Sequence, residues 1–116
     1  MLSDLAIDTL SSALHGISAR QRAIADNIAN VGTPRYLARR VAFEDNLRRA
    51  LNSGEAPRSA TVSETRSLDP TRDDGNNVNL DDEVVSGAET NLRYQLTINA
   101  INQKFHILRT AIREGH

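Results

Sequence analysis

The 116-residue sequence predicts an all-α fold, in which two long terminal helices pack as an antiparallel coiled coil around an irregular middle segment that is at most partly β. Two observations predict it. Near each end of the chain, apolar residues recur at alternating steps of three and four, the spacing of a helix that buries one narrow stripe against another helix. Between these stripes, the chain is rich in Ser, Thr, Asp, Gly and Pro. We therefore divide the chain into an N-terminal helix (1–32), an irregular middle segment (33–79) and a C-terminal helix (80–116).

The N-terminal helix carries the first stripe, which one polar residue interrupts. We expect the helix to begin after Ser3, a suitable N-cap, and to end where Pro34 prevents its continuation, with Asn30 or Gly32 as a left-handed C-cap. Gly16 costs about 1 kcal/mol relative to Ala inside a helix, which indicates either a tolerated weak point or the close approach of a neighbouring backbone. The stripe consists of Ile7, Leu10, Leu14, Ile17, Gln21, Ile24, Ile28 and Val31.

The middle segment is expected to hold one short helix at 41–51, with Arg40, Glu44 and Arg48 on one side. Residues 52–79 have the composition of a solvated loop, with a short strand at 60–63 as the alternative. Because the apolar residues are concentrated at the two ends, we do not expect the middle to contribute to a core. A thin helical pair buries little surface alone, so its stability is expected to come from assembly.

The C-terminal helix is expected to begin after the N-cap Asn79. Asp81, Asp82 and Glu83 follow in its first turn, where the helix dipole favours anions. Its stripe consists of Leu80, Val84, Gly87, Asn91, Tyr94, Ile98, Ile101, Phe105, Leu108 and Ile112.

The two stripes also predict a register. Antiparallel pairing that places Val31 near Leu80 sets Gln21 opposite Asn91, so the polar interruptions of the two stripes meet. A polar pair buried in a coiled coil selects one register, because other registers leave an amide unpaired. The alternative is that both side chains face solvent or a neighbouring subunit.

Composition excludes several classes of function. The net charge is -1 and cysteine is absent, which argues against charge-driven nucleic-acid binding by the whole chain and excludes disulfides and thiolate metal sites. We find neither an apolar run of roughly 18 residues, as a membrane span needs, nor a cleavable secretory signal. We expect no enzymatic activity, no cofactor and no metal site. His15, His106 and His116 form no ligand pattern, the acidic run at 73–83 does not fit the EF-hand spacing, and no serine lies in a nucleophile elbow.

Residues 35–49 hold five arginines, together with Tyr36 and Phe43. Arginine and aromatic side chains can grip phosphate and stack on bases, so a nucleic-acid site is one interpretation. We favour a subunit contact, because Arg and Tyr are enriched at interfaces and residues 69–83 offer a complementary acidic stretch.

Residues 25–36 read A-D-N-I-A-N-V-G-T-P-R-Y and resemble the A-N-N-I-A-N-x-x-T-P-G-Y signature of bacterial flagellar rod, hook and hook-associated proteins. Residues 74–81 (D-G-N-N-V-N-L-D), 91–95 (N-L-R-Y-Q), 104–105 and 108–112 resemble proximal rod members of that family. The likeness covers both terminal helices and the edge of the loop before the second. One position departs from the signature: Arg35 stands where the family has glycine, the residue best suited to a tight left-handed turn.

The resemblance implies a structural subunit of the proximal rod, part of the hollow drive shaft that joins the membrane ring and export gate to the distal rod. It implies other rod proteins, the rod–ring adaptor protein, the membrane ring and the type III export gate as partners, with no nucleic acid. It also implies a place in the basal body rod in the periplasmic space, reached without a cleaved signal peptide. The subunit interface is expected to comprise Leu10, Leu14, Ile17, Gln21, Ile24, Asn27, Ile28, Asn30, Thr33, Pro34, Tyr36, Asn91, Tyr94, Ile98, Ile101, Phe105 and Leu108.

Two other functions stay open at this point. A soluble coiled-coil export chaperone or adaptor would bind a partner helix in the open seam and would be stably helical as a dimer. A nucleic-acid-binding module would lose affinity steeply as salt is raised. A rod subunit is instead expected to be poorly ordered at both ends as a dilute monomer and helical in the assembly.

Overall fold

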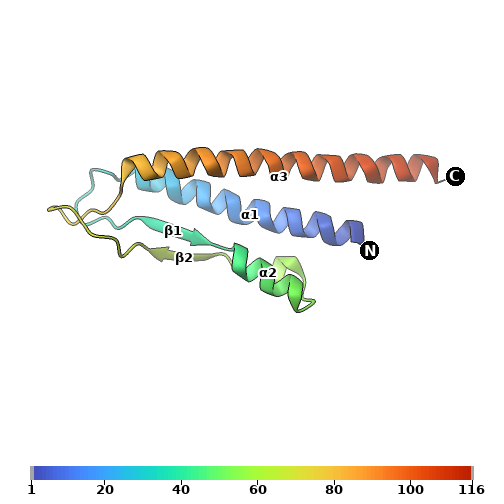
Figure 1. Cartoon of the computed structure of the whole chain (residues 1–116), viewed down its shortest axis with the longest axis horizontal. Coiled ribbons are helices and arrows are strands. Elements are labelled where there is room, and N and C mark those ends of the chain that lie inside the picture. Colours follow the sequence, from blue (N-terminus) through green and yellow to red (C-terminus); the bar gives the residue numbers. More distant parts are fainter. Residues whose placement is uncertain (1, 116) are drawn as a thin grey trace.

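The structure is a computed structural model that describes residues 2–115. Helix α1 (Leu2–Ala29) is followed by strand β1 (Arg39–Ala42), helix α2 (Glu44–Asn52), the 3-10 helix η1 (Pro57–Ser59), strand β2 (Ser63–Arg66) and helix α3 (Leu80–Glu114). Figure 1 shows α1 between α3 on one side and the β1–α2–β2 module on the other. The molecule measures 68 × 27 × 14 Å, and its radius of gyration of 18.0 Å exceeds the ~13 Å of a compact domain of this length. The chain is therefore long and thin.

The terminal helices α1 and α3 lie side by side and antiparallel, as predicted (Figure 1). The amide Nε2 of Gln21 donates to Oδ1 of Asn91 at 2.9 Å. Cγ2 of Ile24 lies 3.6 Å from the position that a Cβ on Gly87 would occupy. The predicted register is therefore confirmed, but Asn91 is exposed, so water can satisfy a mispaired amide and the pair selects the register less strongly than a buried pair would.

The middle segment contains a small sheet, which replaces the first residues of the expected short helix and part of the expected loop. Strands β1 and β2 pair antiparallel, with Arg39 opposite Arg66 and Ala42 opposite Ser63. The predicted helix at 41–51 was wrong at its start, since residues 39–42 are a strand and α2 runs over Glu44–Asn52. The predicted loop was likewise wrong at 63–66, and the strand considered at 60–63 lies three residues further on. The backbone of Arg39 is held by the side chain of Asn27 in α1, a tertiary contact that local propensity does not reveal.

The middle segment also contributes to the core, contrary to expectation. Strand β1, helix α2 and η1 contact α1, whose own buried apolar residues are Ile17, Ala23 and Ile24, and five apolar residues of the middle segment are buried as well. They are Ala38, Phe43, Leu47, Ala50 and Val78. The α1 helix is thus covered on two sides. Other apolar residues of the segment stay at the surface, among them Leu68, which is 94% exposed.

The ends of α1 differ from the prediction. The helix already includes Leu2, so Ser3 is not its N-cap. Neither Asn30 nor Gly32 is left-handed; the described residues with positive φ are Arg35, Gly54 and Gly75. Instead, Nδ2 of Asn30 donates to the Asp26 carbonyl at 2.8 Å and the chain leaves the helix through successive turns. At the start of α3, Oδ1 of Asn79 accepts from the Asp82 amide at 3.1 Å, so this predicted N-cap is confirmed.

Gly16 is required by a side chain and not, as we considered, by a neighbouring backbone. A Cβ at this position would overlap the ring of Phe43. We therefore expect Gly16→Ala to lower the free energy of unfolding by about 2 kcal/mol in urea titrations, because overpacking at Phe43 outweighs the gain in helix propensity. Gly32→Ala is the control, since no atom lies within 4 Å of its added Cβ. A more stable Gly16→Ala variant would contradict the packing described here.

Candidate functional site

The two sequence segments that carry the family signature meet at one end of the molecule. We call this region the junction; it comprises residues 26–40, 67–79 and Glu83. Figure 1 shows the junction where α1 ends and α3 begins. Three asparagines, Asn27, Asn76 and Asn77, are buried in it. An asparagine side chain both donates and accepts hydrogen bonds, so it can replace the backbone partners that irregular chain lacks.

Asn76 holds the end of α1 from the other segment. Its Nδ2 atom donates to the carbonyls of Asn30, Val31 and Thr33 at 2.8, 3.2 and 2.9 Å, and its Oδ1 accepts from the Val78 amide at 2.7 Å. The side chain is fully buried. The carbonyls that follow α1 are therefore satisfied by a residue that lies more than forty positions away in the sequence.

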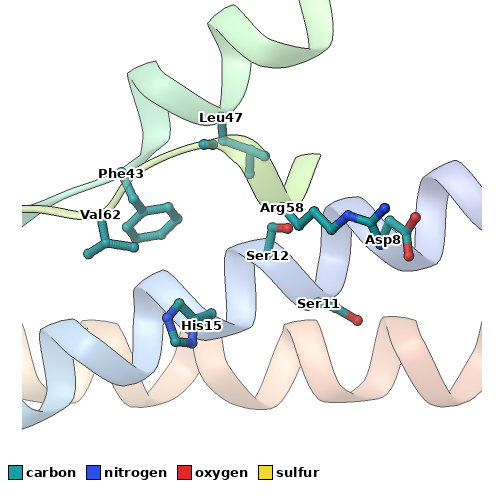
Figure 2. Close-up of a pocket in the computed structure, with 9 residues that line it drawn as sticks. Asp8, Ser11, Ser12, His15, Phe43, Leu47, Arg58 and Val62 are labelled. Carbon is teal, nitrogen blue, oxygen red and sulfur yellow. The ribbon is translucent and has the colours of Figure 1, made fainter. Parts of the chain in front are cut away.

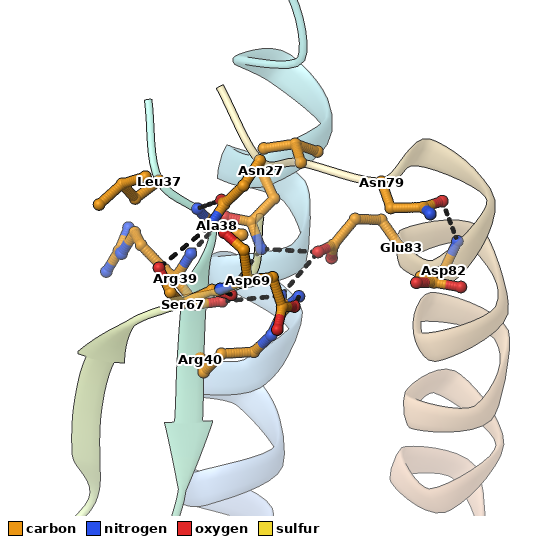
Figure 3. Close-up of polar contacts among 12 residues, drawn as sticks. Asn27, Leu37, Ala38, Arg39, Arg40, Ser67, Asp69, Asn79, Asp82 and Glu83 are labelled. Atoms are coloured by element: carbon orange, nitrogen blue, oxygen red, sulfur yellow. Dashed lines mark hydrogen bonds and ion pairs between the residues drawn. The ribbon is translucent and has the colours of Figure 1, made fainter. Parts of the chain in front are cut away.

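Asn27 joins α1, β1 and α3 at one point, as Figure 3 shows. Its Nδ2 donates to the Arg39 carbonyl at 3.0 Å and to Oε1 of Glu83 at 3.1 Å, while its Oδ1 accepts from the Arg39 amide at 2.8 Å. Glu83 is only 2% exposed and also accepts from Nη1 of Arg40 at 2.8 Å. Each buried side-chain polar atom in the described part of the chain has a partner.

Asn77 fixes the loop to the sheet. Its Oδ1 accepts from the Ala38 amide at 2.7 Å, and its Nδ2 donates to the carbonyls of Ser67 and Asp69 at 3.0 and 3.1 Å. The junction therefore ties the signature turn, the sheet and the start of α3 into one unit.

Arg35 adopts a left-handed backbone conformation, although arginine stands here where the family signature has glycine. Its φ is 62°, its amide donates to the Asp74 carbonyl at 2.8 Å, and Gly75 leaves room for it. A Cβ on Gly75 would lie 3.1 Å from Cγ of Arg35. The turn is thus enforced by its partners despite an unfavourable residue.

We expect Arg35→Gly to raise the free energy of unfolding by about 1 kcal/mol, because glycine adopts φ > 0 without the cost that arginine incurs. Thermal unfolding of the purified chain measures this. A variant no more stable than the parent would show that the turn at Arg35 is unstrained.

Three of the five arginines in residues 35–49 form ion pairs with carboxylates of the same chain. Arg40 contacts Glu83 and lies 3.9 Å from Asp69, Arg39 contacts Asp26 and Glu64, and Arg48 contacts Asp45. We expected the basic residues 35–49 to meet the acidic residues 69–83 across a subunit contact. For Arg40, this pairing of charges instead forms within one subunit. Guanidiniums already paired in this way give the nucleic-acid interpretation less support.

Glu44 at the start of α2 is held by two helices. Nη1 and Nη2 of Arg20 donate to its two carboxylate oxygens, each at 2.7 Å, and Arg93 of α3 lies 3.8 Å away. The guanidinium of Arg20 also lies over the Phe43 ring, 4.9 Å from its centroid. The hydrogen bonds from Arg20 lower the pKa of Glu44 to about 2, against the raising effect of burial.

This pKa predicts an acid-sensitive contribution to stability. Because the pKa in the folded chain is below the ordinary value of 4.5, the contribution is complete above about pH 5 and is lost as the pH falls through ~4.5 towards ~2. The Glu44 side chain is 39% exposed, so solvent screening limits the contribution to about 1 kcal/mol. Urea unfolding at about pH 6 and pH 3 should show a smaller acid loss for Glu44→Gln than for the parent. Glu89→Gln is the exposed control and should lose as much stability on acidification as the parent. An equal acid loss in Glu44→Gln and the parent would refute this role of Glu44.

The predicted interface residues lie along the α1–α3 seam and at the junction. Ile17 and Ile24 are buried, whereas Leu10, Leu14, Ile98, Ile101 and Leu108 are half-buried. Asn27 is buried within the chain. Ile28, Thr33, Pro34, Asn91 and Phe105 are exposed; Gln21, Asn30, Tyr36 and Tyr94 are half-buried. The seam is therefore closed on one side only, and whether a neighbouring subunit covers the other side stays a prediction.

A second apolar surface on α3 was missed by the sequence analysis. We call it the outer stripe; it comprises Val85, Leu92, Leu96 and Ile107, which are 54–66% exposed. At 3.6 residues per turn, Val85 and Leu92 lie about 200° around the helix from the buried Glu83 and Thr90, so they face away from α1. Successive residues of the outer stripe are seven, four and eleven positions apart, and this helical spacing is the signal in the sequence that indicates the stripe. The seam residues dominated the pattern because they have the more regular repeat.

The hollow in Figure 2 lies between α1 and the middle module and has a volume of about 250 Å³. Asp8, Ser12 and His15 line it from successive turns of α1. Asp8 and His15 are about 10 Å apart along the helix axis, so they cannot form the chain of hydrogen bonds that activates a serine. In residues 2–115 we find no group of His, Asp or Glu suited to a metal ion and no helix long and apolar enough to cross a membrane.

Comparison with known proteins defines the class. The family model for flagella basal body rod proteins matches residues 7–36, which span most of α1 and the signature turn of the junction. Three relatives extend the likeness along the chain, each a flagellar basal body rod protein FlgB. The protein from Bacillus subtilis is 31% identical over 94% of both chains. That from Escherichia coli is 27% identical over 97% of this chain and 96% of its own, and that from Cereibacter sphaeroides is 34% identical over 81% and 83%.

The chain thus falls in the class of flagellar basal body rod proteins. Within that class, it belongs to the FlgB family.

Proposed function

We propose that this chain is a structural subunit of the proximal rod, the part of the hollow drive shaft that joins the membrane ring and export gate to the distal rod. The single observation that carries the proposal is the outer stripe: a thin molecule presents apolar side chains along α3 on the face that α1 does not cover. Large exposed apolar surfaces are rare on soluble monomers and mark interaction sites. A function in assembly accounts for this surface, whereas catalysis does not.

In this proposal, the junction and the surface have different tasks. The junction makes each subunit a rigid rod segment by fixing the start of α3 to the end of α1. The outer stripe and the open side of the seam then contact other rod proteins, the rod–ring adaptor protein, the membrane ring or the type III export gate. The subunit reaches the periplasmic rod by type III export without a cleaved signal peptide.

The test is to follow the untagged chain in a strain that lacks the chromosomal copy of its gene. Expression of the chain should restore swimming, and the chain should be recovered in isolated basal bodies at its full length. Retention in the cytoplasm as a soluble dimer, bound to another export substrate, would favour the export chaperone or adaptor and overturn the proposal.

A further inference from the structure

A groove opens between α2 and α3, with α1 as its floor. Its volume is about 510 Å³. Ile17 lies on the floor, Leu47 and Leu51 form the wall from α2, and Leu96 forms the wall from α3. Leu51 and Leu96 are exposed, and Leu96 also belongs to the outer stripe, so the groove continues that apolar surface.

Two arginines stand on the rim of the groove. Arg48 of α2 and Arg93 of α3 line it, and both side chains are exposed. Each also lies close to a carboxylate of its own helix, Arg48 3.0 Å from Asp45 and Arg93 3.5 Å from Glu89, but such exposed pairs are weak and can be exchanged for the carboxylate of a partner. Glu44 also lines the groove, but Arg20 binds both of its carboxylate oxygens and neutralises it. A suitable occupant is therefore a helix that combines apolar side chains with carboxylates.

The first two turns of α3 have this combination. Leu80, Val84 and Val85 are exposed, and so are the carboxylates of Asp81 and Asp82. Glu83 differs, because it turns inward to Asn27 and Arg40. Val85 lies about 16 Å along the helix from Leu96, so this segment cannot fill the groove of its own chain.

We propose that the first two turns of α3 of one copy dock into the groove of a second copy of this chain. The proposal rests on the proposed function as a rod subunit and adds the identity of the surfaces that meet. Two different surfaces of the chain form the contact, which therefore repeats from copy to copy and builds a helical array instead of closing as a dimer. With Val85 of one copy beside Leu96 of the next and the two α3 axes parallel, neighbouring copies are staggered by about 16 Å along the long axis.

Cysteine cross-linking tests the contact, because the chain has no native cysteine. Leu51→Cys in the groove is combined with Val85→Cys on the docking segment, and basal bodies from cells that express the double variant are oxidised. The double variant should give dimers and longer cross-linked species, and either single variant only monomers. The pair Leu51→Cys and Ile107→Cys is the matched control and should give no ladder.

A charge exchange provides the second readout. Arg48→Glu should lower the cross-linking yield about fivefold, which corresponds to ~1 kcal/mol, and Asp81→Arg in the same chain should restore it. Arg49→Glu, on the same helix but outside the groove, should leave the yield unchanged.

The outcomes separate this inference from the proposed function. Basal bodies that contain the double-cysteine chain but show no ladder overturn the docking proposal and leave the rod function intact. Dimers of the Val85→Cys single variant, or a cross-link from Leu51→Cys to a different protein, overturn it too, since another occupant is then present. Absence of the parent chain from basal bodies overturns the proposed function itself.

Discussion

Asn76→Asp is expected to lower the free energy of unfolding by about 4 kcal/mol or more. The substitution changes one group, the Nδ2 donor that serves the carbonyls of Asn30, Val31 and Thr33. A carboxylate in the same fully buried place leaves these carbonyls without a donor and sets a negative charge against them. Small domains have only about 5–15 kcal/mol of stability in total, so the variant should be close to unfolding in urea titrations of the purified chain.

Asn102→Asp is the matched control for this prediction. It makes the same chemical change on an exposed turn of α3 and is expected to shift the free energy of unfolding by less than about 0.5 kcal/mol. Equal stability of Asn76→Asp and Asn102→Asp would show that the hydrogen bonds of the junction do not hold the two signature segments together.

Leu92→Asp is expected to abolish rod assembly and swimming while leaving the monomer folded. Leu92 lies at the middle of the outer stripe and is exposed in the isolated chain, so a carboxylate there meets water. In an assembled rod the same carboxylate would be buried against an apolar neighbour, at a cost of several kcal/mol per contact. Swimming in soft agar and the recovery of rods measure the first effect, and circular dichroism with urea unfolding measures the second.

Asn102→Asp is the control here too and should swim normally, because this exposed position lies about 80° or more around α3 from every residue of the outer stripe. Leu14→Asp and Ile101→Asp are also expected to abolish assembly. Both residues are half-buried between α1 and α3, however, so these variants would also loosen the monomer. Normal swimming of a folded Leu92→Asp strain would remove the outer stripe from the assembly surface.

The two helices and their register were predictable because they depend on repeats within the sequence. Alternating steps of three and four set Gln21 opposite Asn91 and Ile24 opposite Gly87, and the structure pairs both. The cap at Asn79 was predictable for a similar reason, since it depends on a local hydrogen bond. Periodicity and capping act over a few residues, so a single sequence is sufficient to reveal them.

The middle of the chain was not predictable from local pattern. Strand β1 exists because Asn27 binds the backbone of Arg39, and Phe43 becomes core because Gly16 makes room for it. Both contacts join residues that are distant in the sequence. The asparagines of the junction were equally hard to interpret from the sequence. They stand in segments that resemble a family motif, but the backbone groups that Asn76 binds were visible only in the folded chain.

The most direct measurement of the central claim, that the apolar face of α3 is a surface for assembly, is the reactivity of Leu92→Cys with a maleimide. The isolated chain should react quickly, because Leu92 is exposed. In intact basal bodies the same thiol should be protected, and denaturation of the basal bodies should restore its reaction. A thiol that reacts as quickly in the basal body as in the isolated chain would contradict the account.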